Sequence, residues 1–141
     1  PQNISAWIAF TVTNINVYHV PEFISWKLQQ NFKKINKGKT KIITHHVCHK
    51  PWYSSIRVLP SNIKKDITAH YEDWKEKFET YDDNTKKRAC SILDSISNYM
   101  NAKDESDKLS NFVEYTKKLD TIRNQSILDI VPQYKDIFDE K

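Results

Sequence analysis

The spacing of hydrophobic positions changes along the chain and predicts strands first and helices later. Residues 4–13 (ISAWIAFTVT) are dense in β-branched and aromatic side chains without clean alternation, a pattern typical of a strand covered on both faces. Residues 41–48 (KIITHHVC) predict a second strand. Between these two segments, apolar side chains recur at helical spacing after Pro21, which the first turn of a helix tolerates. These side chains are Phe23, Ile24, Trp26, Leu28 and Phe32.

A strand, a helix and a strand in this order predict a βαβ unit, because parallel strands need a crossover of this kind. We expect the helix to close at residues 36–39, around Gly38. A sheet of two strands is only marginally stable by itself. Since the chain also begins with Pro1 rather than Met, we expect further chain upstream that supplies the neighbouring strands.

Helical spacing dominates the chain after Pro60. Ser61 is expected to cap a first helix. Two more helices are predicted at about residues 84–100 and 106–123, followed by a short helix at 126–130 that Pro132 interrupts. The expected inward positions are Ile63, Ile67, Tyr71, Trp74 and Phe78 in the first helix, Ala89, Ile92, Leu93, Ile96, Tyr99 and Met100 in the second, and Leu109, Phe112, Val113, Thr116, Leu119 and Ile122 in the third. The fold class is therefore predicted as α/β, with a βαβ unit in residues 1–60 and a region of about three helices in residues 61–141.

Composition excludes several classes of protein. Four Trp, seven Tyr and six Phe among 141 residues are enough for a hydrophobic core. A single glycine excludes a Walker loop, a dinucleotide-binding fingerprint and a nucleophile elbow. Two cysteines without a signal-peptide pattern indicate a reducing compartment, and we expect the cytoplasm. No apolar stretch approaches the roughly 20 residues that span a bilayer, so no membrane partner is expected.

The charge pattern does not favour nucleic-acid binding. The net charge is +4, and basic and acidic residues are mixed through the helical part, as on solvated faces. The densest basic run is Lys33, Lys34, Lys37, Lys39 and Lys41, which we interpret as a solvated loop. We therefore do not expect a nucleic-acid partner.

Four side chains able to bind metal or transfer protons lie at the end of the second predicted strand. They are His45, His46, Cys48 and His49. Strand geometry directs His46 and Cys48 to one face and His45 to the other. Zinc needs three or four converging ligands, whereas one face offers two, so we expect no metal site. The alternative is that one face packs against helices while the other lines a polar cavity. A nucleophilic role for Cys48 is weaker still, because the sequence shows no third, orienting group.

Polar side chains also end the first predicted strand, at Thr11, Thr13 and Asn14. In parallel α/β folds, ligands bind beyond the carboxyl ends of the strands. We therefore expect Thr13 and Asn14 to lie near His46 and His49 and to line a site with them. Taken alone, Asn14 is more commonly a turn residue. No pair of carboxylates stands out as catalytic, so the catalytic residues stay unassigned.

Two segments resemble motifs of the twitch-type radical S-adenosylmethionine (SAM) proteins of phages and bacteria. Residues 49–60 (HKPWYSSIRVLP) are similar to their H-x-P-x-x-x-S-I-x-x-L-P stretch, through His49 and through Pro51, Ser55, Leu59 and Pro60. Residues 112–124 (FVEYTKKLDTIRN) are similar to their C-terminal F-x-x-[YF]-T-x-x-L-D-x-x-R signature, through Phe112, Leu119, Asp120 and Arg123. Residues 11–26 resemble a late barrel unit. The resemblance spans nearly the whole chain but only about the last third of such a protein.

The resemblance implies the end of a partial (β/α) barrel followed by C-terminal helices. It implies that Thr13, Asn14, His46 and His49 help to hold SAM or substrate, and that the second motif packs helices. The family binds a 4Fe–4S cluster through C-x-x-x-C-x-x-C, which the two cysteines of this chain cannot form. Both SAM and the cluster would therefore belong to the full-length protein, and an upstream segment would carry the cluster. The chain alone would be neither cluster-binding nor catalytic.

Two other interpretations stay open. One is a non-enzymatic interaction module in which aromatic side chains around Trp74 and Tyr99, or the edges of the small sheet, dock a protein partner. The other, weaker interpretation is a nucleic-acid-binding accessory protein that uses the basic run at residues 33–41.

Overall fold

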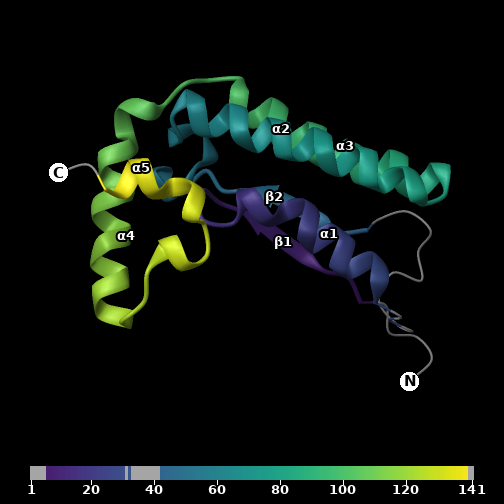
Figure 1. The fold of residues 1–141 in the computed structure, drawn as a ribbon, viewed down its shortest axis with the longest axis horizontal. Coiled ribbons are helices and arrows are strands. Elements are labelled where there is room, and N and C mark those ends of the chain that lie inside the picture. Colours follow the sequence, from purple (N-terminus) through teal and green to yellow (C-terminus); the bar gives the residue numbers. More distant parts are fainter. Residues whose placement is uncertain (1–5, 31, 33–41, 140–141) are drawn as a thin grey trace.

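The computed structural model describes residues 6–30, 32 and 42–139. Helices make up most of this structure, and two parallel strands form a small sheet, β1 (Ala9–Val12) and β2 (Thr44–Val47). Helix α1 (Val20–Gln29) connects them in the chain (Figure 1). The mixed α/β class and the parallel pairing of the two predicted strands are therefore confirmed.

The N-terminal elements are shorter than the sequence predicts. The ladder keeps four residues in each strand, and Ala6 forms only an isolated bridge. Helix α1 ends at Gln29, and Gln30 is extended, with φ −79° and ψ 134°. The prediction of a helix that runs to residues 36–39 is wrong at this end, because residues 29–31 (QQN) supply no apolar side chain to bury. The proposed stop at residues 36–39 and most of the basic run lie outside the described residues.

Four further helices follow: α2 (Ser61–Lys77), α3 (Asp83–Asn101), α4 (Leu109–Arg123) and α5 (Lys135–Phe138). Helices α2 and α3 form a hairpin. Helices α4 and α5 lie at the open end of this hairpin, where α2 begins and α3 ends (Figure 1). The expected short helix after α4 is a 3-10 turn, Ile127–Asp129. The prediction that Ser61 caps α2 is wrong, because Pro60 occupies the N-cap and its carbonyl accepts the Lys64 N–H at 3.0 Å.

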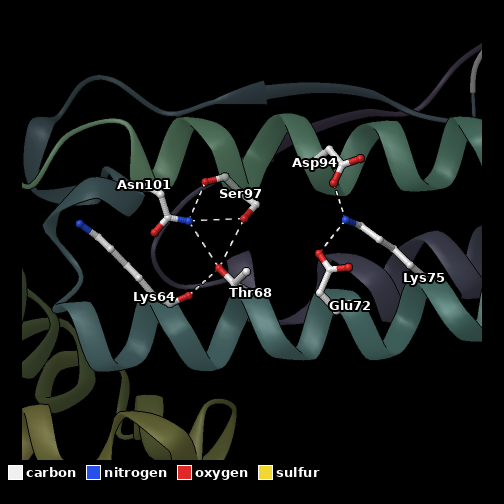
Figure 2. A network of polar contacts seen from close by, with 7 residues as sticks. All are labelled: Lys64, Thr68, Glu72, Lys75, Asp94, Ser97 and Asn101. Atoms are coloured by element: carbon white, nitrogen blue, oxygen red, sulfur yellow. Dashed lines mark hydrogen bonds and ion pairs between the residues drawn. The ribbon is translucent and has the colours of Figure 1, made fainter.

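A polar seam joins the two helices of the hairpin on one side (Figure 2). Asn101 Nδ2 lies 3.4 Å from Thr68 Oγ1 and donates to the Ser97 carbonyl at 2.9 Å. Farther along the seam, Lys75 of α2 pairs with Asp94 of α3. These contacts fix the register of two helices whose opposite faces bury apolar side chains.

The predicted apolar stripes of α2 and α3 form much of the core. Fully buried side chains include Ile56, Leu59, Ile67, Leu93, Ile96 and Phe112. One inward assignment is wrong: Ile122 of α4 is 80% exposed. Helix α4 buries the face that carries Phe112 and Thr116, and Ile122 lies about 120° around the helix from Thr116, at about 100° per residue.

Two buried tyrosines tie distant segments to the turn after β1. Tyr71 Oη donates to the Val17 carbonyl at 2.6 Å, and Tyr134 Oη donates to the Asn14 carbonyl at 2.6 Å. Burial is the main cause that raises the pKa of both phenols, Tyr71 well above 10.0. Helix α2 and the C-terminal segment are therefore anchored at neighbouring points of the chain.

Stability is expected to fall steeply above pH 10. In that range the unfolded chain loses phenolic protons that Tyr71 and Tyr134 keep in the folded state. The free energy of unfolding should therefore decrease by up to about 1.4 kcal/mol per pH unit for each tyrosine. Urea titrations between about pH 9 and 11 measure this slope. The Tyr71→Phe/Tyr134→Phe double variant should show a shallower slope, and an unchanged slope would contradict the assignment.

Candidate functional site at the carboxyl ends of the strands

The two faces of the sheet have different surroundings. On one face, Phe10 stacks on Phe23 of α1 with ring centroids 4.6 Å apart, and His45 Nε2 lies 3.4 Å from Ser95 Oγ of α3. On the other face, the strand register places Thr11 beside His46, and both are exposed. The expectation of a first strand covered on both faces therefore fails within the described residues, where helices cover one face only.

The open face is where the predicted site residue His46 lies. Its imidazole has no hydrogen bond or ion pair to any other described residue, so it is free to meet a ligand. The open face thus presents the Thr11 hydroxyl and the His46 imidazole. His45, on the covered face, has its pKa lowered, mainly by burial and then by the nearby His46, which keeps it neutral at pH 7.

Asn14 is completely buried and organises the loop after β2. Its N–H donates to the Ser54 carbonyl at 3.1 Å and its Nδ2 to the Tyr53 carbonyl at 2.7 Å. Its own carbonyl accepts the Tyr134 hydroxyl, while its Oδ1 has no partner among the described residues. In this arrangement Asn14 positions the site and does not reach its surface.

Thr13 builds the turn that leaves β1. Its N–H donates to Asn16 Oδ1 at 2.9 Å, and its carbonyl accepts the Val17 N–H at 2.9 Å. Asn16 Nδ2 also donates to the Thr11 carbonyl at 3.0 Å. Thr13 is half-buried, so its methyl and hydroxyl groups retain partial access to solvent.

His49 belongs to a cluster that sequence analysis did not find. Its Nδ1 lies 2.7 Å from the Tyr99 hydroxyl. The Arg57 guanidinium lies 3.8 Å from the centroid of the Tyr99 ring, and Arg57 Nε donates to the Tyr99 carbonyl at 3.0 Å. Tyr99 was assigned to the core by its helical spacing, and no sequence signal pairs it with His49. The cluster gives an exposed imidazole a fixed orientation and a hydroxyl neighbour.

Both cysteines are free thiols in the described part of the chain. Cys48 Sγ donates to the Lys50 carbonyl at 3.4 Å. The Lys50–Pro51 peptide bond is cis. Within the described ranges, no three His, Cys, Asp or Glu side chains converge as metal ligands. Cys90, the other thiol, lies on α3, and its pKa is raised mainly by burial.

The residues of the first motif, in segment 49–60, are mostly involved in packing and in capping α2. Ser55 is buried, and its Oγ accepts the Arg57 N–H at 3.3 Å. Leu59 is fully buried, Pro60 caps α2 and Pro51 is exposed. This segment therefore connects the sheet to the helical hairpin.

The second motif packs the C-terminal turn against α4. The Phe112 ring meets Tyr134 and Phe138 edge-on. Asp120 Oδ2 accepts the Ile127 N–H at 2.8 Å. Leu119 and Arg123 line a small pocket of about 190 Å³ beside that turn. These contacts agree with a packing role for the motif.

Comparisons with known proteins add no relative. No family model matches the chain, and neither a curated protein nor a solved structure matches it. Among the described helices, none has the length and apolarity needed to cross a bilayer.

Proposed function

We propose that this chain is the C-terminal part of a cytoplasmic radical SAM enzyme and lines the SAM and substrate side of its partial (β/α) barrel. The observation that carries the proposal is the asymmetry of the sheet. Helices α1 and α3 lie on one face, while Thr11 and His46 are exposed on the other. In a (β/α) barrel the helices pack outside the strands, and ligands bind at the carboxyl ends of the strands. Short strands with one open face would gain neighbours from the remainder of such a barrel.

The residues divide into ligand-facing and positioning groups under this proposal. His46 and His49 are exposed and would meet SAM or substrate. Asn14, which is buried, would position them through the loop after β2, and Thr13 would shape the turn after β1. An imidazole can donate to or accept from a bound polar group, which suits a site that holds a carboxylate or a hydroxyl.

This chain by itself lacks the thiolates that a 4Fe–4S cluster requires. A cluster with an open iron for SAM needs three thiolates, and Cys48 and Cys90 are the only two cysteines. When bound, the cluster would supply the electron that cleaves SAM, so an upstream segment, in the same or a separate polypeptide, would have to hold it. The chain alone is expected to be inactive.

Anaerobic iron–sulfur reconstitution tests the proposal. It would be run on this chain and on the chain joined to its upstream coding sequence, with absorbance and electron paramagnetic resonance as readouts. A cluster signal that changes with SAM, in the longer protein only, is the expected result. No cluster in either protein would refute the proposal.

Replacing His46 by alanine in the longer protein is expected to weaken SAM or substrate binding about tenfold, because one hydrogen bond to a charged or polar ligand group is lost. The SAM concentration that half-saturates the change in the resonance signal measures this effect. His19→Ala is the matched control, because this imidazole belongs to the turn before α1 and contacts the Ile130 carbonyl. If both variants raised the half-saturating SAM concentration equally, His46 would not be a ligand-binding residue.

A non-enzymatic interaction module is the second candidate. Each strand has one edge without a partner strand among the described residues, and such edges invite pairing with another chain. Trp74 and Tyr99 support this candidate less, because both are half-buried against their own chain. The upstream reading frame separates the two candidates: a C-x-x-x-C-x-x-C motif there favours the enzyme, and its absence favours the module.

A further inference from the structure

A second, separate surface feature lies between the start of β2 and the N-terminal half of α3. It is a groove of about 560 Å³. The described lining includes Ile43 and His45 on the strand side and Lys87, Arg88 and Ile92 of α3. The volume lies in the range of small-molecule sites. Among the described residues that line the groove, none carries a carboxylate.

Two side chains of α3, Lys87 and Arg88, bring positive charge to the groove. Neither Lys87 nor Arg88 forms an ion pair within the described parts of the chain, although many other lysines do. Asp83 precedes Lys87 by one helical turn and borders the adjacent groove, yet the two form no ion pair.

The other carboxylates near this part of α3 already have partners. Glu79 pairs with Lys86, and Asp94 pairs with Lys75 (Figure 2). Asp82 Oδ1 accepts the Thr85 N–H at 3.0 Å as the N-cap of α3. The local positive charge therefore stays available to an anion.

The other lining groups match a phosphate ester. Ser91 and Asn84 offer hydroxyl and amide donors, and His45 offers an imidazole ring. The floor is apolar, since Ile43 is 4% exposed and Ile92 8% exposed. Phosphate takes charge-assisted hydrogen bonds from Lys and Arg, and an apolar floor can contact a base. The lack of lining carboxylates argues against a metal ion.

We propose that this groove binds the phosphate of a nucleotide, with Lys87 and Arg88 as the main anion ligands and Ile43 and Ile92 beneath the base. The nucleotide can be free or part of a single strand, since both present the same phosphate chemistry. Such a partner was not predictable from the sequence, because the basic residues do not collect on one face along the chain. The fold brings two of them opposite His45, about 40 positions away.

Isothermal titration calorimetry on the whole chain tests the proposal, with adenosine monophosphate and a ten-nucleotide single-stranded DNA as the two probes. We expect the Lys87→Ala/Arg88→Ala variant to lose at least about tenfold in affinity, because two charge-assisted contacts disappear. Lys65→Ala/Lys117→Ala is the matched control: it removes the same charge from exposed positions of α2 and α4 and should bind as the parent does. Circular dichroism would check that both variants stay folded.

Each outcome decides the matter. Binding of the mononucleotide that only the groove variant weakens supports a free-nucleotide site. Binding of the single strand alone, again weakened only by the groove variant, supports the phosphate site and assigns it to nucleic acid. Binding of neither probe, or equal losses in the two variants, would overturn the proposal. Neither readout involves SAM or a cluster, so this test is independent of the proposed enzyme.

Discussion

Tyr134→Ala is expected to lower the free energy of unfolding by about 3–5 kcal/mol, the cost of removing a buried aromatic ring. Tyr134 is fully buried, its ring meets Phe112 edge-on, and its hydroxyl donates to the Asn14 carbonyl at 2.6 Å. The variant would leave a cavity between α4 and the C-terminal segment. It would also leave the buried Asn14 carbonyl without a hydrogen-bond donor. Equilibrium unfolding in urea, followed by circular dichroism, measures the loss.

Two further variants separate the ring from the hydroxyl group. Tyr134→Phe keeps the ring and should cost only about 1–3 kcal/mol, the penalty of leaving the Asn14 carbonyl unpaired. Tyr115→Ala removes a tyrosine that is 42% exposed and should cost about 1 kcal/mol or less. If Tyr134→Ala cost no more than Tyr115→Ala, the C-terminal segment would not be docked as the structure has it.

Asn14→Asp is expected to be nearly as disruptive at pH 7, with a loss of about 3–5 kcal/mol, because it places an uncompensated carboxylate in a buried site. The substitution preserves shape but replaces the amide donor that lies 2.7 Å from the Tyr53 carbonyl. Two acceptor oxygens would then face each other without a proton between them. The loop after β2, which carries His49, would lose the side-chain bond to residue 14 and keep only the bond from that residue's backbone N–H to the Ser54 carbonyl.

The pH dependence distinguishes this explanation from a general loss of packing. Burial raises the pKa of the introduced carboxyl above its unfolded value near 3.9. Below that value both states are protonated, and the O–H can donate to the Tyr53 carbonyl, so the defect should largely disappear. It should grow as the pH rises through the folded-state pKa. Urea titrations at about pH 4 and pH 7 measure the difference. Asn98→Asp, on the exposed face of α3, should be near neutral at both; a pH-independent defect in Asn14→Asp would refute the role of charge.

The elements that local pattern specifies were predictable. The apolar stripes of α2 and α3 are long and regular, and the structure buries Ile67, Leu93 and Ile96 as the spacing requires. Both strands were found from their β-branched and aromatic content. Helix α1 was predicted too long because Phe32 continues its spacing, yet it lies beyond the end of the helix.

The site was predictable only in part. Alternation along β2 separates His45 from His46, which the burial of the two imidazoles confirms. Asn14 was expected at the site, but its complete burial depends on Tyr53 and Tyr134, which lie 39 and 120 positions away. The contact of His49 with Tyr99 and Arg57 likewise joins residues from separate elements.

The sequence by itself determined the order and type of the main elements, since helical and strand periodicity are properties of neighbouring residues. Tertiary structure alone decided which face of the sheet stays open, which face of α4 is buried, and that Lys87 and Arg88 lie across a groove from His45. Those outcomes depend on how α1, α3 and the C-terminal segment pack. Packing joins residues far apart in the chain, and no local pattern encodes their distances.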